Sequence, residues 1–307
     1  MEPLRDPSSS PIAPAPGPRD FKYYIFDWDN NILHMPTRIH LQRRRTDGDW
    51  EDCSVSTSLY AVVRHDSANY RPPDGDWEKA FRDFRDFAHR PESAFLVDTR
   101  EALAPVIAGE REPAPSFQRF RQALVEGRLI AIVTARGHRA QTIRLGVEYF
   151  IDQVLDASEK AMMILNLRAY KEAFGEPHEQ AADAEILNAY LSLNQYHAVT
   201  SPEFKQRMSR DFPGAQSPEE AKQFAIRDFV EHVVRILKEK GGFDRPISVG
   251  FSDDDPLNVR AVERFISGEL GRAFPGVKFV VYDTSDPEQE HGRKIVVQGQ
   301  LELGLDV

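Results

Sequence analysis

Two aspartates separated by one residue, Asp27 and Asp29, follow a run of four apolar or aromatic residues, Tyr23 to Phe26. A short run of this kind predicts a buried strand. Ionised carboxylates are costly to bury without a cation or strong hydrogen-bond donors, so packing alone does not explain the pair. At the carboxyl edge of a parallel sheet, where open α/β folds bind ligands, they would be placed to hold a metal and do chemistry. The alternative is a turn at the strand end with solvated carboxylates.

Two later apolar runs also end in polar side chains. Leu129 to Val133 leads into Thr134, Ala135 and Arg136, and Ile247 to Phe251 leads into Ser252, Asp253, Asp254 and Asp255. If these runs are parallel strands beside the first, all the polar groups meet at one edge of the sheet. Lys222, in the first turns of the preceding predicted helix, is our candidate for a cation at that edge, and Lys205 is its competitor.

Each of these positions also has a purely structural interpretation. Thr134 could be the N-cap of the following helix, and Asp255 could cap a helix that begins near Pro256. Arg136 and His138 could contact a substrate or could be exposed loop residues.

Strands alternating with helices predict a mostly parallel α/β sheet for the rest of the chain. Tyr196–Val199 and Val277–Tyr282 are the further predicted strands, and 116–126, 141–149 and 218–240 are the predicted helices. Residues 156–194 form a largely helical insertion, and the Pro-rich residues 1–20 are expected to be disordered.

Residues 35–113 do not follow this alternation, and we expect a separate α+β insert there. Asp47-Gly48 between two β-like runs predicts a hairpin, and Trp77 to Phe87 is predicted to be a helix with a phenylalanine stripe. Arg43, Arg44 and Arg45 are interpreted as a solvated hairpin edge rather than as an anion contact. The core would therefore comprise residues 21–34 and 114–307.

Composition excludes several classes of function. The 307 residues carry a net charge of −10, which disfavours nucleic-acid binding by bulk charge, and the single Cys53 rules out an internal disulfide and a multi-cysteine zinc site. The sequence contains no apolar run of membrane-spanning length, no secretory signal, no P-loop and no histidine pair with metal-ligand spacing. We therefore expect a cytoplasmic protein; the oligomeric state is not readable from the sequence.

The set and order of these groups resemble the haloacid-dehalogenase (HAD) superfamily of phosphohydrolases. Its four motifs would be Asp27-Trp28-Asp29, Thr134, Lys222 and Asp253-Asp254, covering roughly residues 21–34 and 115–285. Two departures are visible: Asn31 stands where the family often has Thr or Val, which could shift substrate preference, and the acidic motif is an adjacent pair. The resemblance implies a Rossmann-like three-layer α/β core with residues 35–113 as a cap.

The resemblance also implies a Mg²⁺-dependent phosphatase. Asp27 would be the nucleophile that forms an aspartyl-phosphate, and Asp29 the general acid and base. Thr134, Ala135, Arg136 and Lys222 would bind the phosphoryl group, and Asp27, Asp29 (through its carbonyl), Asp253 and Asp254 would supply metal ligands.

We expect a phosphorylated small molecule as substrate; a nucleic-acid end is disfavoured by the charge. The alternatives are a phosphotransferase on the same core, with an acceptor other than water, and a non-catalytic phospholigand-binding or scaffold protein.

Overall fold

A six-stranded sheet forms the centre of the computed structural model, which describes residues 21–86, 94–173, 181–211, 217–240, 247–286, 289 and 292–298. The strand order is β6-β5-β1-β7-β8-β9, and every neighbouring pair is parallel except β8 with β9. The strands are β1 (Phe21–Phe26), β5 (Ile130–Thr134), β6 (Gln195–Ala198), β7 (Ile247–Asp253), β8 (Val277–Asp283) and β9 (Arg293–Gln298). The predicted mostly parallel α/β sheet is confirmed.

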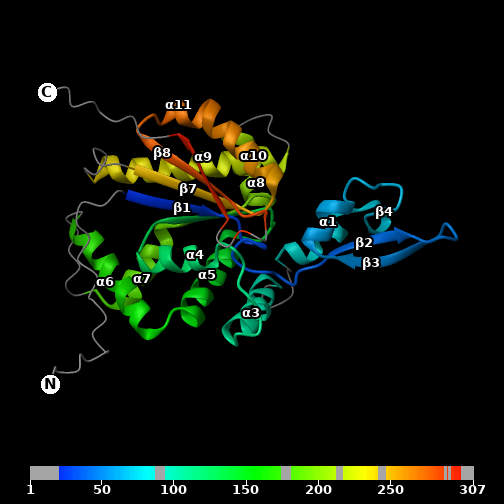
Figure 1. Cartoon of the computed structure of the whole chain (residues 1–307), viewed down its shortest axis with the longest axis horizontal. Coiled ribbons are helices and arrows are strands. Elements are labelled where there is room, and N and C mark those ends of the chain that lie inside the picture. Colours follow the sequence, from blue (N-terminus) through cyan, green and yellow to red (C-terminus); the bar gives the residue numbers. More distant parts are fainter. Residues whose placement is uncertain are drawn as a thin grey trace, which may run out of the picture.

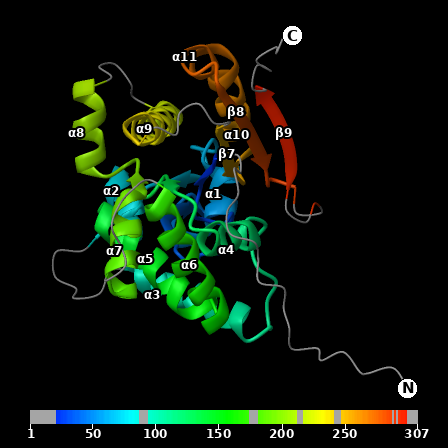
Figure 2. The same cartoon turned by 90° about the vertical axis from the view of Figure 1, so that its left-hand side faces the viewer.

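Helices cover both faces of this sheet (Figures 1 and 2). One face carries α8 (Pro202–Asp211), α9 (Pro218–Glu239), α10 (Pro256–Phe265) and α11 (Gly271–Ala273), with a π-helical turn at Ile266–Leu270. The other carries α3 (Ala94–Ile107), α4 (Phe117–Val125), α5 (Ala140–Val154), α6 (Ala157–Ala173) and α7 (Asp183–Leu193).

Side-chain alternation in the strands explains the two layers of core. In β1, Tyr23 and Ile25 pack into the cluster under α9, whereas Phe26 packs into the cluster under α4 and α5. Successive side chains of a strand point to opposite faces, so a central strand must be apolar on both. The unbroken apolar run that predicted β1 follows directly from this position.

A capping box starts the long helix α9. Ser217 accepts from the backbone N–H of Glu220, the Glu220 side chain accepts from the backbone N–H of Ser217, and Pro218 occupies the first turn. Ala225, Phe229 and Val233 then face the sheet and are fully buried. This packing fixes the direction in which the remaining side chains of α9 point.

The insert contains its own small sheet, ordered β3-β2-β4, beyond the carboxyl edge of the main sheet (Figure 1). It comprises β2 (Ile39–Arg44), β3 (Trp50–Val55), α1 (Thr57–Val63), β4 (Tyr70–Arg71), a 3-10 turn at Pro73–Gly75, α2 (Trp77–Ala80) and a second 3-10 turn at Arg82–Phe84. The hairpin around Asp47-Gly48 is present, with Gly48 at φ 93°.

Two expectations for the insert need adjustment. The helix predicted over 77–87 ends at Ala80, because the chain turns at Phe81 (φ −101°, ψ 24°) and a 3-10 turn directs Phe84 into the insert core; Phe87 lies outside the described residues. Helix α3 lies within the 35–113 span, but Phe95 and Leu103 pack into the main core beside α5. The insert's own hydrophobic core therefore uses residues 39–84.

The expected disordered tail, residues 1–20, lies outside the described residues. Helices α6 and α7 occupy the expected helical insertion, 156–194. Among the described residues, no helix is both long and apolar enough to cross a membrane.

Candidate active site

Three neighbouring strands end at one edge of the sheet, and each delivers a polar side chain there. Asp27 follows β1, Thr134 is the last residue of β5, and Asp253 is the last residue of β7. Asp27 is 5% exposed, so the alternative of a solvated carboxylate in a strand-end turn is wrong for this residue; Asp253 is 1% exposed. The backbone N–H of Asp27 donates to the carbonyl of Ser252 at 2.9 Å, which locks the ends of β1 and β7 together.

Lys222 is the cation between these two carboxylates. Its Nζ lies 3.1 Å from Oδ1 of Asp27 and 2.7 Å from Oδ2 of Asp253. Lys222 lies in the second turn of α9 and is 4% exposed. Burial alone would lower the pKa of Lys222, but attraction to Asp253 and Asp27 raises it above the usual lysine value. Its competitor Lys205 is exposed on α8, and among the described residues it is Lys222 that pairs with both carboxylates.

The site holds more negative charge than this lysine balances. Burial raises the pKa of Asp27 well above its usual value; Lys222 opposes this shift, and the neighbouring Asp253 and Asp254 add to it. Burial and then repulsion by Asp253 raise the pKa of Asp254 to about 7. A divalent cation at this edge would relieve the same repulsion.

The donor types suit magnesium, which prefers oxygen ligands and few protein carboxylates. Asp27, Asp253 or Asp254 and the carbonyl of Asp29 are the groups that would hold it. In the arrangement described, Oδ2 of Asp253 accepts from Lys222, and Oδ1 accepts from the backbone N–H of Asp255 at 3.0 Å and from Asn258 at 3.2 Å. Within the described ranges, no group of three or more His, Cys, Asp or Glu side chains is already gathered as a metal cluster.

Asp29 lies beside the Asp27–Lys222 cluster and is bound by Arg136. Nε and Nη2 of Arg136 donate to Oδ2 and Oδ1 of Asp29 at 2.8 and 2.6 Å, and the Thr134 hydroxyl lies 3.4 Å from Oδ2. Arg136 is fully buried and lies over the rings of Phe84 and Phe95, at 4.8 and 5.2 Å from their centres. The interpretation of Arg136 as an exposed loop residue is therefore wrong, and its proposed phosphate contact would have to be made by a guanidinium that already binds Asp29.

A tight turn after Asp29 sets the direction of both aspartates. The backbone N–H groups of Ile32 and Leu33 donate to the carbonyl of Trp28 at 3.0 and 3.2 Å, and Asn30 adopts the left-handed conformation at φ 55°. Asparagine tolerates this conformation better than most residues. The Asn30 side chain then donates to the Thr57 hydroxyl of the insert at 3.0 Å, so the insert contacts the loop that carries the site.

Asn31 connects the ends of neighbouring strands through side-chain hydrogen bonds. Its Nδ2 donates to the carbonyls of Asp27 and Ser252 at 3.0 and 3.1 Å, and its Oδ1 accepts from the hydroxyls of Ser252 and Thr284 at 3.0 and 2.9 Å. The side chain is fully buried. The departure from Thr or Val at this position thus builds a hydrogen-bonded joint between β1, β7 and the end of β8. The sequence analysis marked Asn31 but missed this role, and it assigned no role to Ser252, Asn258 or Thr284.

The remaining predicted residues separate clearly. Thr134 is buried and does not cap α5, whose N-cap residue is Arg139, so that alternative is wrong. Asp255 is the N-cap of α10, because its Oδ1 accepts from the backbone N–H of Leu257 at 2.8 Å. Ala135 is exposed next to Thr134, and His138 is buried rather than exposed.

Comparisons of this chain with protein-family models, with curated protein sequences and with solved structures found no match. The class is therefore defined by the molecule itself. It is an α/β protein with a buried carboxylate–lysine cluster at the carboxyl edge of a parallel sheet and an insert beside that edge.

Proposed function

We propose that this protein is a HAD-like, Mg²⁺-dependent phosphatase that hydrolyses a phosphate monoester through an aspartyl-phosphate on Asp27. The observation that carries the proposal is the buried Lys222, which bridges Asp27 and Asp253 from adjacent strand ends. The placement of Asp29, Thr134 and the insert at the same edge supports it, and the order of these groups along the chain is that of the HAD motifs.

The first half of the reaction would be displacement at phosphorus. A carboxylate oxygen of Asp27 attacks, the bond between phosphorus and the ester oxygen breaks, and Asp29 supplies the proton that the leaving alcohol takes. Lys222 neutralises charge on Asp27 and on the phosphoryl oxygens, and the Thr134 hydroxyl with nearby backbone N–H groups orients those oxygens. Magnesium, when bound, supplies charge neutralisation between the two anionic reactants.

The second half would be hydrolysis of the acyl phosphate. Water attacks phosphorus, Asp29 takes its proton, and the bond to Asp27 breaks, which returns both carboxyl groups to their starting states. Arg136 holds the Asp29 carboxyl group in one direction for both steps, in which Asp29 acts first as the protonated acid and then as the carboxylate base. Each half thus uses side chains that the fold already places side by side.

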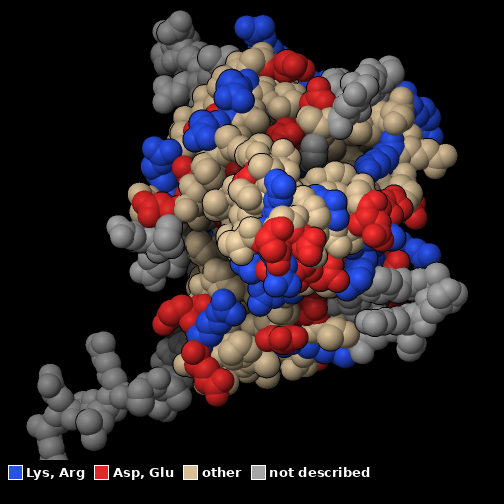
Figure 3. Space-filling view, turned by 90° about the vertical axis from the view of Figure 1, so that its right-hand side faces the viewer, with Lys and Arg blue, Asp and Glu red and all other residues tan. Residues whose placement is uncertain are grey.

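The balance of charges on the surface of the insert favours a small phosphorylated substrate over a long nucleic acid. On the insert side of the molecule, acidic and basic side chains are interspersed (Figure 3). Arg43, Lys79 and Arg85 are paired with Glu51, Asp74 and Glu78 respectively, consistent with a solvated hairpin edge at Arg43. Phosphate binding along a polyanion requires unbalanced basic groups.

The test is phosphate release from 4-nitrophenyl phosphate and from a panel of small phosphate esters, with Mg²⁺ or with excess chelator. Asp27→Asn should reduce turnover by about a thousandfold or more, because it removes the nucleophile. The matched control is Asp255→Asn, since Asn caps a helix about as well as Asp and the Asp255 side chain bonds the start of α10 rather than the cluster. Turnover that survives in Asp27→Asn, or that is indifferent to the chelator, would contradict the proposal.

A further inference from the structure

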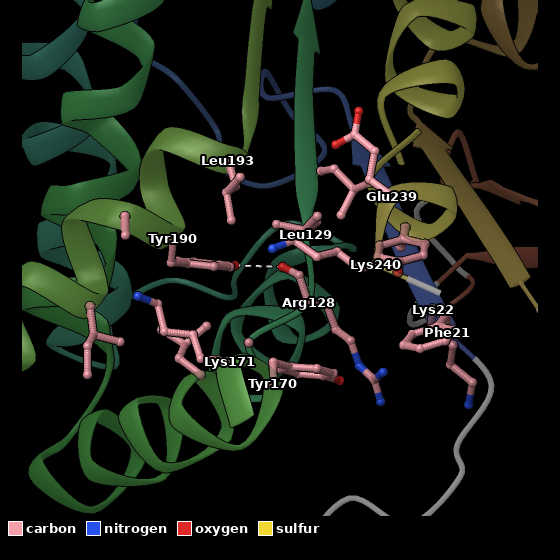
Figure 4. A pocket seen from close by; sticks show the side chains of 16 residues that line it. Phe21, Lys22, Arg128, Leu129, Tyr170, Lys171, Tyr190, Leu193, Glu239 and Lys240 are labelled. Carbon is pink, nitrogen blue, oxygen red and sulfur yellow. Dashed lines mark hydrogen bonds between the residues drawn. The ribbon is translucent and has the colours of Figure 1, made fainter. Parts of the chain in front are cut away.

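A pocket lies at the amino-terminal edge of the sheet, opposite the candidate active site. Its lining includes Phe21, Lys22 and Tyr23 at the start of β1 and the turn from Gly127 to Leu129 that leads into β5. Asp27 and Thr134 lie at the other ends of these two strands. Helices α6, α7 and the end of α9 complete the walls (Figure 4). The pocket is therefore separate from the candidate active site.

The volume of this cavity, about 240 Å³, is enough for a small organic molecule. Dry apolar cavities of about 150 Å³ are known to bind a single benzene ring. Most of the wall is aromatic or aliphatic, with side chains from Phe21, Tyr23, Leu167, Tyr170, Ile186 and Tyr190. An apolar body of one or two rings thus fits both the volume and the walls.

Two close contacts hold the walls in place. Gly127 is in the left-handed conformation at φ 64°, and a Cβ there would lie 2.9 Å from Cδ2 of Leu167, so α6 is pressed against the turn. The Tyr190 hydroxyl donates to the Arg128 carbonyl at 2.6 Å, which ties α7 to the same turn. A cavity whose walls are fixed before binding spends less free energy on ordering when a ligand enters.

The charged groups of the pocket are mainly cationic. Among the described residues that line it, Lys22, Arg128, Lys171 and Lys240 are basic and Glu239 is acidic. Arg128 is 6% exposed and uses its Nε to bind Glu126 at 2.9 Å. Figure 4 shows the Arg128 and Lys22 side chains extending to the same side of the pocket, next to Tyr170. An anionic group on that side of the pocket would face Lys22 and the guanidinium of Arg128, which also pairs with Glu126.

We propose that this pocket is a binding site for a hydrophobic carboxylate, with the apolar body inside the cavity and the carboxylate at Arg128 and Lys22. A neutral molecule of the same shape would fill the cavity but gain nothing from the cations. A fully polar anion would pair with the cations, but the apolar walls of the pocket would remain in contact with water. The site therefore selects ligands that combine the two properties. This inference does not depend on the proposed phosphatase activity.

The test is binding of 1-naphthoate to the full chain by titration calorimetry, with 1-naphthalenemethanol as the uncharged control. We expect naphthoate to bind at least tenfold more tightly than the alcohol. Arg128→Gln should abolish most of that difference and leave binding of the alcohol within about twofold. Equal binding of both compounds, or no binding of naphthoate at millimolar concentration, would overturn the proposal.

A cavity-filling variant locates the site. Ala189→Phe, on the wall contributed by α7, should remove binding of both compounds, whereas the same change at the exposed Ala184 of the same helix should leave it intact. Naphthoate binding that survives Ala189→Phe would place the ligand elsewhere. If Ala189→Phe does not fold, Lys22→Gln at an exposed side chain gives the decision: it must weaken naphthoate severalfold without affecting the alcohol.

Discussion

Arg136 grips Asp29 side-on, through Nε and Nη2, and donates from the same Nη2 to the Thr37 hydroxyl at 2.6 Å. Thr37 in turn donates to Asp98 on α3. Thr37 lies on the segment that enters the insert, and Asp98 on the helix that returns from it. Both connections between core and insert therefore meet at the guanidinium that holds the proposed general acid and base.

Replacing Arg136 by lysine should separate the effect of its positive charge from the effect of its paired hydrogen bonds to Asp29. Lysine keeps the positive charge but cannot make two parallel hydrogen bonds to one carboxylate. We expect turnover to fall by about 10- to 100-fold, because Asp29 loses its fixed direction, and the free energy of unfolding to fall by about 2 kcal/mol. Phosphate release and urea denaturation measure the two effects. Arg139→Lys, at an exposed position three residues later, should change neither.

Removing the cation of the buried cluster should destabilise the protein strongly. Lys222→Met leaves Asp27 and Asp253 without their shared partner, and breaking a buried pair on one side costs about 3–5 kcal/mol. Urea denaturation would measure it. Lys205→Met, on an exposed helix face, should stay within about 0.5 kcal/mol of the parent. Equal losses in the two variants would mean that Lys222 does not neutralise the carboxylates.

Magnesium should stabilise the folded chain independently of any turnover. A ligand at a hundred times its dissociation constant adds about 2.7 kcal/mol to the free energy of unfolding, which a thermal melt detects easily. The shift should disappear when Asp253 and Asp254 are both changed to Asn, and it should persist in Asp255→Asn. Sodium chloride at equal ionic strength is the control for screening; the same shift with sodium would argue against a specific site.

His138 should make the protein sensitive to mild acid. The ring is buried, its two nitrogens have no hydrogen-bond partner among the described residues, and burial followed by the charge of Arg136 lowers its pKa from 6.5 to about 3. In the unfolded chain His138 binds a proton below about pH 6.5, whereas in the folded chain it stays neutral down to about pH 3. Stability contributed by the neutral ring is complete above pH 6.5 and is lost as the pH falls, by about 2 kcal/mol at pH 5.

His138→Phe measures this contribution. A phenylalanine ring beside Phe95 cannot bind a proton in either the folded or the unfolded chain. The melting temperature of the variant minus that of the parent should therefore be larger at pH 5 than at pH 8. His65→Gln, at an exposed position on the insert, should show no such difference. A parallel pH dependence of parent and His138→Phe would show that another group causes the acid loss.

The central strands could be predicted from the sequence because their position leaves little choice of residue. β1, β5, β7 and β8 lie between two helical layers and must be apolar on both sides, which gives a continuous run. The edge strand β9 and the two-residue β4 carry no such requirement and were not predicted. The helix starts at Pro218 and after Asp255 could be predicted because the chemistry of a helix N-terminus is local.

The strand-end residues of the candidate site could be predicted from the sequence, but the residues that hold them in place could not. The sequence marks the strand-end residues because each polar group directly follows an apolar run: Asp27 and Asp29, Thr134, and Asp253 to Asp255. Nothing local distinguishes Lys222 from Lys205, because the choice depends on how α9 rotates against the sheet. The role of Asn31 depends on hydroxyls 221 and 253 residues away, at Ser252 and Thr284, and such a distance leaves no trace in a local pattern.

The central position of β1 has a consequence for biosynthesis. Of the described strands, β1 is synthesised first, yet its partner on one side, β7, follows 226 residues later along the chain. At about 5–20 residues per second, synthesis keeps that edge of β1 unpaired for roughly 10–45 s. The insert hairpin, whose contacts are local, can form during this interval, whereas the Asp27–Lys222–Asp253 cluster can form only after β7 has been synthesised. We therefore expect nascent chains that stop before β7 to need protection by chaperones.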